Sequence, residues 1–276
     1  MKTKIILEVG YNHIGNFEIA KQMIDIAAKL NVWGIKFQKW DIENIPEDIK
    51  IKKRTDKHAF GKTYYEHRKY LEFSLCQILE LKKYAEDLNL NFVCSGKDFE
   101  SLKLLVNSGI KYIKIPSQGW LNESILRYLT EVKKEKDLFI FASTGMSTHK
   151  EIMDFKHTNN KIYDVIMHCV SLYPPEYEDI DLNFLNDNRS FYNGYSSHEI
   201  NGSAIKYAVN IGMEWVERHY TLNKLLKGTD HIISSTPEEI KKIQSEIEIA
   251  ETLRGNDFRQ MTKKEYENRN FYRNII

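Results

Sequence analysis

Two histidines are the residues of this sequence whose placement points most directly to chemistry. His198 and His219 lie 21 positions apart, and each follows a short β-like segment, residues 194–196 and 215–217. The residues between them, 202–211, have a helical pattern. Imidazoles from successive strands of a βαβ unit lie side by side at one edge of a parallel sheet, where they can bind a metal ion. From these two residues alone, a pair of buried structural histidines stays open as the alternative.

Polar residues also stand at or just after the ends of the other predicted strands. They are Glu8, Lys36, Gln38, Ser95, Lys114, Ser117, Ser143, Ser171, Tyr173, Ser196 and Glu217. In a barrel of parallel strands, these ends converge on one mouth. A single strand-end serine is typical of an ordinary rim residue, but a polar set on all eight strands indicates an active site.

The two strand-end lysines predict an anion site. Lys36 and Lys114 follow the alternation that points side chains into the barrel, where an unpaired cation costs free energy. Together with hydroxyls and backbone amides, they suit a phosphate plus a carboxylate. Barrel closure also predicts that Glu8 lies near His219. A carboxylate with two imidazoles suits Mn²⁺ or Zn²⁺ better than Mg²⁺ alone, so we expect Mn²⁺ first, with Mg²⁺ or Co²⁺ as alternatives.

The remaining histidines carry weaker signals. His231 follows Asp230 in the loop after the last strand, where either residue is expected near a polar substrate. His13 lies in the first βα loop and is expected at the rim. Four others have polar neighbours and are interpreted as surface residues: His58, His67, His149 and His157.

The elements that must position these residues follow from the hydrophobic pattern. Short apolar runs alternate with longer amphipathic ones, which is typical of βα units. Eight such units in about 250 residues predict an α/β protein with one domain, a (β/α)₈ TIM barrel over residues 1–255. An open doubly wound sheet is the runner-up, but Gly10 and Gly15 are spaced wrongly for a dinucleotide-binding turn.

Two segments lie outside this repeat. A polar insertion, residues 41–72, interrupts the second unit. Residues 256–276 form a polar and aromatic C-terminal extension, which we expect to pack on the barrel or against a second subunit.

The composition excludes several classes of protein. Lys plus Arg number 40 and Asp plus Glu number 39, so charge gives no reason to expect nucleic acid or an anionic membrane as a partner. The sequence has three cysteines, Cys76, Cys94 and Cys169. Because this number is small and odd, it does not indicate a disulfide framework. With no signal pattern and no apolar run near the roughly 20 residues that span a bilayer, we expect a cytoplasmic protein.

Eight short stretches together resemble the sialic acid synthase family. They occur in the family's order: EVGYNH at 8–13, IKFQ at 35–38, YIKIPS at 112–117, ASTGM at 142–146, CVSLYP at 169–174, GYSSH at 194–198, ERHYT at 217–221 and GTDH at 228–231. The resemblance implies an enzyme that condenses phosphoenolpyruvate with an N-acetylmannosamine-like aldose and releases phosphate. The product would be a nonulosonic acid, that is, a sialic-acid-like 2-keto-3-deoxy sugar acid.

The resemblance also implies a role for each site residue. His198 and His219 would bind the metal, which would polarise the aldehyde of the sugar, and Glu8 would transfer a proton. Phosphoenolpyruvate would be held by Lys36, Ser95, Lys114, Ser117, Ser143, Ser171 and Ser196. The sugar would be faced by Glu8, Gln38, Tyr173, Glu217 and Asp230.

The sequence departs from the family pattern mainly on the sugar side. Gln118 and Gly119 stand where the family often has Gly-Glu, Ser197 replaces an Asp, and Lys97 ends a segment that is usually Thr-Pro-Phe. We expect the barrel domain only, without the C-terminal antifreeze-like domain that family members usually carry. A homodimer, and a separately encoded antifreeze-like protein that completes the site, therefore stay open. So do two other functions: a synthase of another 3-deoxy acid, and an inactive barrel that acts as a binding or scaffold partner.

Overall fold

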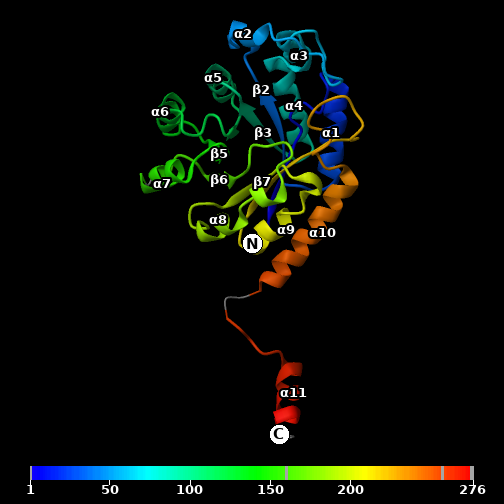
Figure 1. The fold of residues 1–276 in the computed structure, drawn as a ribbon, viewed down its shortest axis with the longest axis vertical. Coiled ribbons are helices and arrows are strands. Elements are labelled where there is room, and N and C mark those ends of the chain that lie inside the picture. The colour runs from blue at the N-terminus through cyan, green and yellow to red at the C-terminus, as the bar shows by residue number, and fades with distance from the viewer. Residues whose placement is uncertain (1, 159–160, 256–257, 274–276) are drawn as a thin grey trace.

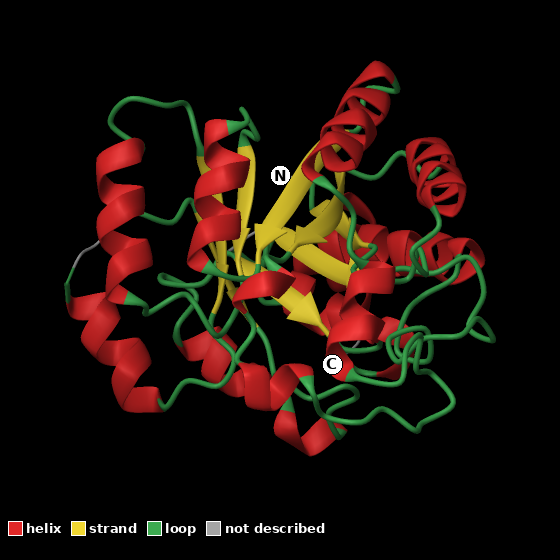
Figure 2. Ribbon diagram, turned by 90° about the horizontal axis from the view of Figure 1, so that it is seen from above, coloured by secondary structure: helices red, strands yellow, loops and turns green. Residues whose placement is uncertain are grey.

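The protein is a closed barrel of eight parallel strands surrounded by helices (Figures 1 and 2). The computed structural model describes residues 2–158, 161–255 and 258–273. The strands pair in chain order, and β8 pairs with β1 to close the barrel. The predicted (β/α)₈ fold is therefore confirmed, and the open sheet is excluded.

The observed elements follow the predicted alternation of eight strands with helices. The strands are β1 (Lys4–Glu8), β2 (Gly34–Lys39), β3 (Asn91–Gly96), β4 (Tyr112–Ile115), β5 (Phe139–Ser143), β6 (Val165–His168), β7 (Gly194–Ser197) and β8 (Trp215–His219). The helices that follow them are α1 (Phe17–Lys29), α4 (Leu75–Asp87), α5 (Phe99–Asn107), α6 (Glu123–Val132), α7 (His149–His157), α8 (Leu182–Asp187), α9 (Ile205–Asn210) and α10 (Pro237–Arg254). Short 3₁₀ turns lie at η1 (Ile42–Asn44), η2 (Tyr177–Asp179) and η3 (Ile200–Gly202).

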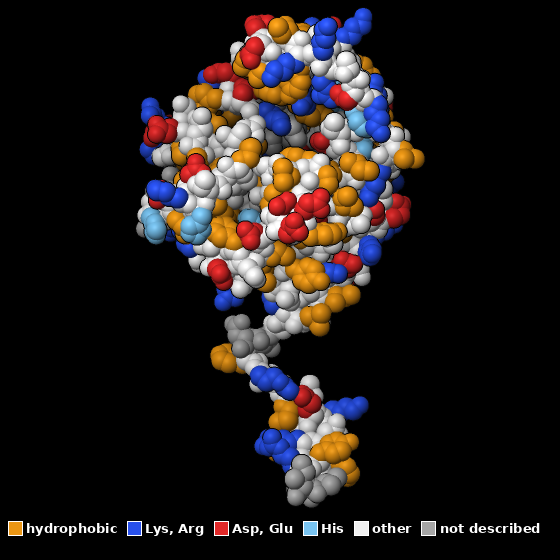
Figure 3. Space-filling view, in the orientation of Figure 1, with side chains coloured by type: hydrophobic (Ala, Val, Ile, Leu, Met, Phe, Trp, Pro, Cys, Tyr) orange, Lys and Arg blue, Asp and Glu red, His pale blue; other side chains and the backbone are white. Residues whose placement is uncertain are grey.

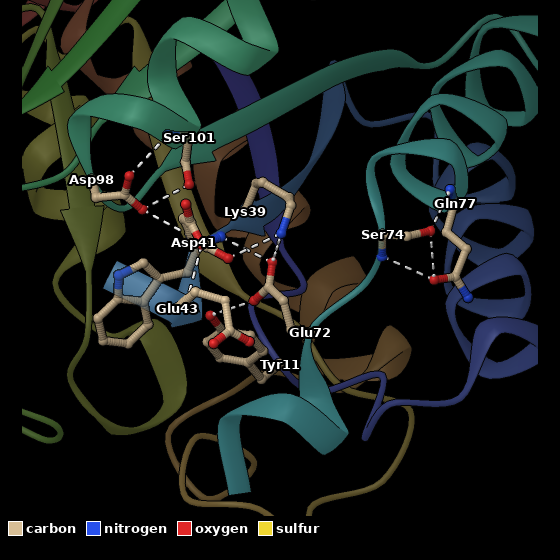
Figure 4. Close-up of polar contacts among 10 residues, drawn as sticks. Tyr11, Lys39, Asp41, Glu43, Glu72, Ser74, Gln77, Asp98 and Ser101 are labelled. Carbon is tan, nitrogen blue, oxygen red and sulfur yellow. Dashed lines mark hydrogen bonds and ion pairs between the residues drawn. The ribbon is translucent and has the colours of Figure 1, made fainter. Parts of the chain in front are cut away.

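Local capping signals define where several helices begin. Asn16 accepts hydrogen bonds from the backbone N–H groups of Glu18 and Ile19 and so starts α1. Ser74 and Gln77 form a capping box at the start of α4 (Figure 4). Such caps satisfy backbone donors that the first turn of a helix leaves without partners.

Apolar side chains fill the interior of the barrel below its mouth. This inner cluster consists of Ile6, Val93, Phe141, Val165, Met167 and Trp215. A larger core lies between the outer face of the strands and the helices. The alternation along each strand separates the two cores, and it leaves the strand ends free to present polar groups to the mouth.

The insertion between β2 and α4 forms part of the rim of the mouth. It contains α2 (Glu47–Lys50) and α3 (Tyr64–Leu71). Its last turn is fixed by Glu72, which accepts hydrogen bonds from Lys39 Nζ at 2.6 Å, from the Trp40 backbone N–H at 2.9 Å and from Tyr11 Oη at 3.2 Å (Figure 4). These bonds attach the insertion to the ends of β1 and β2.

The C-terminal extension differs from its prediction. Helix α11 (Lys263–Arg273) buries none of its residues, and Figure 1 shows it apart from the barrel. The expectation that it packs on the barrel is therefore wrong, and packing against a second subunit stays a prediction, as does the domain boundary at residue 255. Within the ranges given above, no helix combines the length and the apolar character needed to cross a bilayer.

Candidate active site

All fourteen residues predicted for the site line one cavity at the carboxyl ends of the strands. The cavity has a volume of about 360 Å³ and is bordered by loops that follow the strands and by the insertion. Figure 3 shows a hollow in the upper half of the barrel face, with Lys and Arg side chains at its edge. Residues that are up to 222 positions apart, Glu8 and Asp230 among them, are thus brought together.

Four charged residues form a buried ion network at the base of the cavity, which we call the floor network: Glu8, Lys36, Lys114 and Glu217. Lys36 Nζ lies 2.7 Å from Glu8 Oε2 and 3.5 Å from Glu217 Oε1. Lys114 Nζ lies 3.1 Å from Glu217 Oε2. Only 4% of Lys36 and 2% of Lys114 is exposed, so the lysines point into the barrel as predicted.

Hydroxyl groups complete the contacts of the floor network. Ser196 Oγ donates to Glu217 Oε1 at 3.1 Å, and Lys36 Nζ donates to Ser95 Oγ at 3.3 Å. Glu217 was predicted to face the sugar, but its carboxylate lies between the two lysines. Its direct contacts are therefore with the cations of the floor.

The floor network gives its two carboxyl groups different pKa values. Burial opposes ionisation of Glu217, but the charges of Lys114 and Lys36 prevail and lower its pKa to about 2. Burial raises the pKa of Glu8, and the negative charge of Glu217 adds to this, while Lys36 opposes it. Glu217 is thus a permanent anion, and Glu8 is the carboxyl group closer to accepting a proton.

A second group of hydroxyls surrounds Gly145, beside the floor network. A Cβ atom placed on Gly145 would lie 2.8 Å from Ser117 Oγ and 2.9 Å from Cys169 Sγ, and closer still to Ser171 Oγ. Ser143, at the end of β5, lines the same cavity. The missing side chain of Gly145 therefore lets Ser117, Cys169 and Ser171 come close together, and all three line the cavity.

The two histidines at the ends of β7 and β8 lie side by side. Their ring centroids are 5.4 Å apart. His198 Nδ1 lies 2.7 Å from the Val170 carbonyl oxygen, which fixes the tautomer with the proton on Nδ1. Burial lowers the pKa of each histidine to about 4, so both rings are neutral at pH 7. His219 Nδ1 is buried and has no hydrogen-bond partner among the residues that the structure describes.

Glu8 does not join these histidines as a third ligand. It is aligned with His219 across the β1–β8 pair, as predicted, but its carboxylate turns toward Lys36 and Gln38. Among the described residues, no three His, Cys, Asp or Glu side chains are arranged to hold a metal ion. The aromatic neighbour of the pair is Tyr173, whose ring centroid lies 4.4 Å from that of His198.

The insertion contributes residues to the cavity that sequence reasoning missed. His67, interpreted as a surface residue, is 5% exposed and lines the cavity, and its Nδ1 accepts a hydrogen bond from the Phe60 backbone at 3.1 Å. Arg68 and Arg54 line it as well. The available signal was the capping box of Thr63 and Glu66, which starts α3 just before His67.

Two loop histidines are more buried than expected. His13, predicted at the rim, is 3% exposed and stacks on Phe73 with ring centroids 4.1 Å apart. His231 lies 1% exposed, with its Nδ1 2.7 Å from Thr221 Oγ1. His13 thus has a stacking partner and His231 a hydrogen-bond partner, whereas Gly228, Thr229 and Asp230 of the loop after β8 line the cavity.

Comparisons with known proteins agree with this architecture. The profile of the NeuB family matches residues 23–259. The chain is 37% identical over 251 residues to the N-acetylneuraminate-9-phosphate synthase of Drosophila melanogaster, which covers 88% of this chain and 66% of that protein. It is 30% identical over 289 residues to the N,N'-diacetyllegionaminic acid synthase of Legionella pneumophila. That match covers 99% of this chain and 79% of the Legionella protein.

A solved structure has the same arrangement of elements. The crystal structure of the N-acetylneuraminic acid synthetase from Leptospira borgpetersenii, in complex with citrate, superposes with a TM-score of 0.81 at 29% identity. The match covers 99% of this chain and 92% of that chain.

Proposed function

Because the chain belongs to the NeuB family, we propose that it joins phosphoenolpyruvate to an N-acetylmannosamine-like aldose, with release of phosphate. The product is a nonulosonic acid, a 2-keto-3-deoxy sugar acid. The observation that carries this proposal is the single cavity in which cations, hydroxyls, an adjustable carboxyl group and two neutral imidazoles meet.

In the proposed reaction, C3 of phosphoenolpyruvate forms a bond to the aldehyde carbon of the open-chain aldose. The aldehyde oxygen takes up a proton, and a water oxygen adds to C2 and gives one up. The bond from C2 to the phosphate oxygen then breaks, so that inorganic phosphate leaves and a ketone remains at C2. One water molecule is consumed for each phosphate released.

Lys36 and Lys114 bind the anionic groups of phosphoenolpyruvate in this proposal. Both ammonium groups are already held in place by Glu8 and Glu217, so little conformational freedom is lost when the substrate binds. The hydroxyls around Gly145 donate hydrogen bonds to the same anion. Ser95, Ser143 and Ser196 line the cavity beside them.

Glu8 transfers the proton. Its raised pKa lets it carry a proton at an intermediate stage, whereas Glu217 stays ionised and keeps the lysines oriented. Gln38 donates a hydrogen bond to Glu8 and orients the carboxyl group. A Cβ atom on Gly10 would lie 3.3 Å from Glu8 Oε1 and 3.9 Å from Asp230 Oδ2, so both carboxylates border the same space.

His198 and His219 fit a divalent metal ion as two of its ligands. Both rings are neutral at pH 7, His198 has the backbone hydrogen bond that orients metal-binding imidazoles, and His219 has a buried nitrogen without a partner. Because the described residues offer no third protein ligand, solvent and substrate would supply the remaining ligands. Mn²⁺ is the ion we propose first, and when bound it would polarise the aldehyde of the sugar.

The acceptor side is formed by residues nearer the mouth. Tyr173 is 54% exposed, and it lies beside the histidine pair, where it can contact the sugar. Asp230 lines the same side. A cytoplasmic location, expected from the sequence pattern, belongs to this proposal, as do a homodimer and a separately encoded antifreeze-like partner, which are expected from the resemblance.

Phosphate release from phosphoenolpyruvate tests the proposal. The protein with Mn²⁺ is assayed with N-acetylmannosamine, mannose, arabinose and diacetamido-hexoses. Release that depends on one aldose supports the synthase and identifies its acceptor class. Absence of release with every aldose, together with absence of phosphoenolpyruvate binding, would instead favour a barrel without catalytic activity.

A further inference from the structure

A buried guanidinium group lies on the outer side of the strand that carries His219. Arg218 stands between Glu217 and His219 on β8, and none of it is exposed. Glu217 and His219 line the cavity, and because side chains alternate along a strand, Arg218 points outward, toward the layer between the strands and the helices. The proposed reaction does not use this charge, although a buried charge is costly.

The guanidinium donates hydrogen bonds around both histidines of the pair. Its Nη1 donates to the Glu199 carbonyl oxygen at 2.6 Å and to Ser197 Oγ at 3.1 Å, so it contacts the residues on both sides of His198. Its Nε donates to Ser235 Oγ at 2.8 Å. The Ser235 backbone N–H in turn donates to the His219 carbonyl oxygen at 2.8 Å. One side chain therefore connects the two segments that carry the imidazoles.

A second buried charge lies in the same layer. The guanidinium itself contacts only uncharged oxygens, among them the Ile233 carbonyl at 2.7 Å. The carboxylate of Glu199, which is 0% exposed, accepts hydrogen bonds from Tyr195 Oη and from the Ala204 backbone N–H, each at 3.0 Å. In the ranges that the structure describes, it forms no direct ion pair with Arg218. Burial lowers the pKa of Arg218, and the negative charge of Glu199 opposes this, so the two charges compensate each other.

The same carboxylate holds the turn that follows His198. Asn201 and Gly202 have φ angles of 67° and 65°, in a region that side chains adopt only rarely. The hydrogen bond from Ala204 to the Glu199 carboxylate spans this turn. A Cβ atom on Gly202 would lie 3.4 Å from Nε of the guanidinium, so the glycine leaves room for that group.

We propose that Arg218 and Glu199 are positioning residues that hold the imidazoles of His198 and His219 in place for the metal ion. This inference rests on the metal site of the proposed function. Groups that orient metal-binding imidazoles from behind typically contribute a factor of about 10 to 100 in metal affinity. A buried cation that loses its compensating anion is strongly unfavourable, so loss of the carboxylate should disturb both histidine segments.

The test measures the affinity of the metal-free protein for Mn²⁺ by electron paramagnetic resonance, together with the urea midpoint. Glu199→Gln keeps the shape of the side chain but removes its charge, and it should weaken Mn²⁺ binding by about 10- to 100-fold. Ser197 already contacts the guanidinium, so adding Ser197→Asp to this variant supplies a new carboxylate there. The double variant should recover an affinity within about threefold of the wild type.

The matched control removes a hydrogen-bonded carboxylate at the opposite end of the barrel. Asp164 precedes β6 and accepts a hydrogen bond from the Ile140 backbone N–H at 2.7 Å. Asp164→Asn should lower the urea midpoint and leave the Mn²⁺ affinity unchanged. An unchanged Mn²⁺ affinity in Glu199→Gln, or an equal loss in Asp164→Asn, would overturn the inference. If Glu199→Gln does not fold, Arg218→Lys, which keeps the charge but offers fewer donors, replaces it under the same criteria.

A metal-free measurement separates this inference from the metal assignment. If the wild-type protein does not bind Mn²⁺, the proposed metal site fails first, and the ring of His198 then decides. In protein with ¹⁵N-labelled histidine, nuclear magnetic resonance follows the Nδ1 proton that bonds to the Val170 carbonyl oxygen. Exchange of this proton with water that is at least about tenfold faster in Glu199→Gln, but not in Asp164→Asn, supports the positioning role. Equal exchange rates in Glu199→Gln and the wild type would contradict it.

Discussion

The floor network and two cations at the mouth are both positively charged regions of one cavity, but they are built differently. In the floor network, Lys36 and Lys114 are buried and paired with Glu8 and Glu217. At the mouth, Arg68 and Lys97, which we call the mouth cations, are packed on aromatic rings and have no carboxylate partner among the described residues. The floor belongs to the strand ends, whereas Arg68 belongs to an insertion.

The two regions show two ways in which a folded protein can hold cations ready to bind an anion. Burying a cation deep in a barrel is costly, so the folded protein needs a carboxylate that a substrate anion later supplements. A cation nearer to solvent can stay unpaired at a smaller cost. The floor therefore contributes to folding as well as to binding, whereas the mouth cations are expected to add little to folding.

The largest effect is expected at the two histidines of the same cavity. His219→Ala should lower turnover by at least about 1,000-fold, because one remaining imidazole cannot keep the metal ion. Mn²⁺ binding, followed by electron paramagnetic resonance, should be lost in parallel. The matched control is His157→Ala on α7, outside the cavity, which should behave as the wild type. Retained Mn²⁺ binding and turnover in His219→Ala would remove the metal assignment.

Removing a cation of the floor should cost both stability and binding. Lys114→Met leaves the buried carboxylate of Glu217 with one cation fewer, and we expect a loss of about 3 kcal/mol in the free energy of unfolding. Phosphoenolpyruvate binding should weaken in the same protein. Urea denaturation and calorimetry measure the two effects. An unchanged unfolding free energy would show that the floor network does not stabilise the fold.

Acid should destabilise the protein through its buried neutral histidines. Burial lowers the pKa of His13 to about 3, whereas the unfolded chain has an ordinary value near 6.5. Between these values the unfolded state binds the additional proton, so stability falls as the pH decreases from about 6.5 toward 3. His13→Gln should reduce the pH dependence of the unfolding free energy between pH 7 and 4 by about 3 kcal/mol. An identical pH dependence in the variant would contradict this.

The close contacts around Gly145 give a smaller and more local test of the phosphoenolpyruvate site. Gly145→Ala should weaken phosphoenolpyruvate binding by about 10- to 100-fold, because the methyl group would lie where the hydroxyls of Ser117 and Ser171 converge. Gly109→Ala would introduce a methyl group into open space but at a positive φ, so Gly119→Ala, 3.2 Å from Ile125 Cδ1, is the better control. Equal affinities in Gly145→Ala and Gly119→Ala would place the phosphate elsewhere.

The smallest effect is expected on the stability of the ligand-free protein when Lys97 at the mouth is replaced. Lys97→Met should change the free energy of unfolding by less than about 1 kcal/mol, in the stabilising direction, because it removes a cation that Arg68 repels. Comparison of the urea midpoints of Lys97→Met and Lys114→Met measures the contrast directly. A loss as large as that of Lys114→Met would mean that the two regions are built alike.

The strand ends could be predicted from the sequence because a barrel leaves them little freedom. The period of two in β2 and β4 fixed the direction of Lys36 and Lys114, and chain order placed Glu8 opposite His219. The direction of the Glu8 carboxylate could not be predicted, because it depends on whether the carboxylate pairs with Lys36 on the neighbouring strand β2 or faces His219 on β8.

The insertion could not be predicted in the same way. Residues 41–72 are polar and have no extended period, and α3 has only eight residues. His67 was therefore interpreted as a surface residue, and Arg68 was not singled out. Contacts with Phe60, Tyr11 and Trp40 nevertheless bring both residues to the cavity. Such residues are placed by tertiary contacts, which local patterns do not contain.

The most direct test of the central claim is the fate of the carbon atoms of phosphoenolpyruvate. The protein, Mn²⁺ and phosphoenolpyruvate labelled with ¹³C at all three carbons are incubated with N-acetylmannosamine or its 6-phosphate, and the products are analysed by mass spectrometry. The account predicts a sugar acid that carries all three labelled carbons, formed in equal amount with inorganic phosphate. Labelled pyruvate without a sugar adduct, or labelled phosphoenolpyruvate that stays unchanged with both sugars, would contradict it.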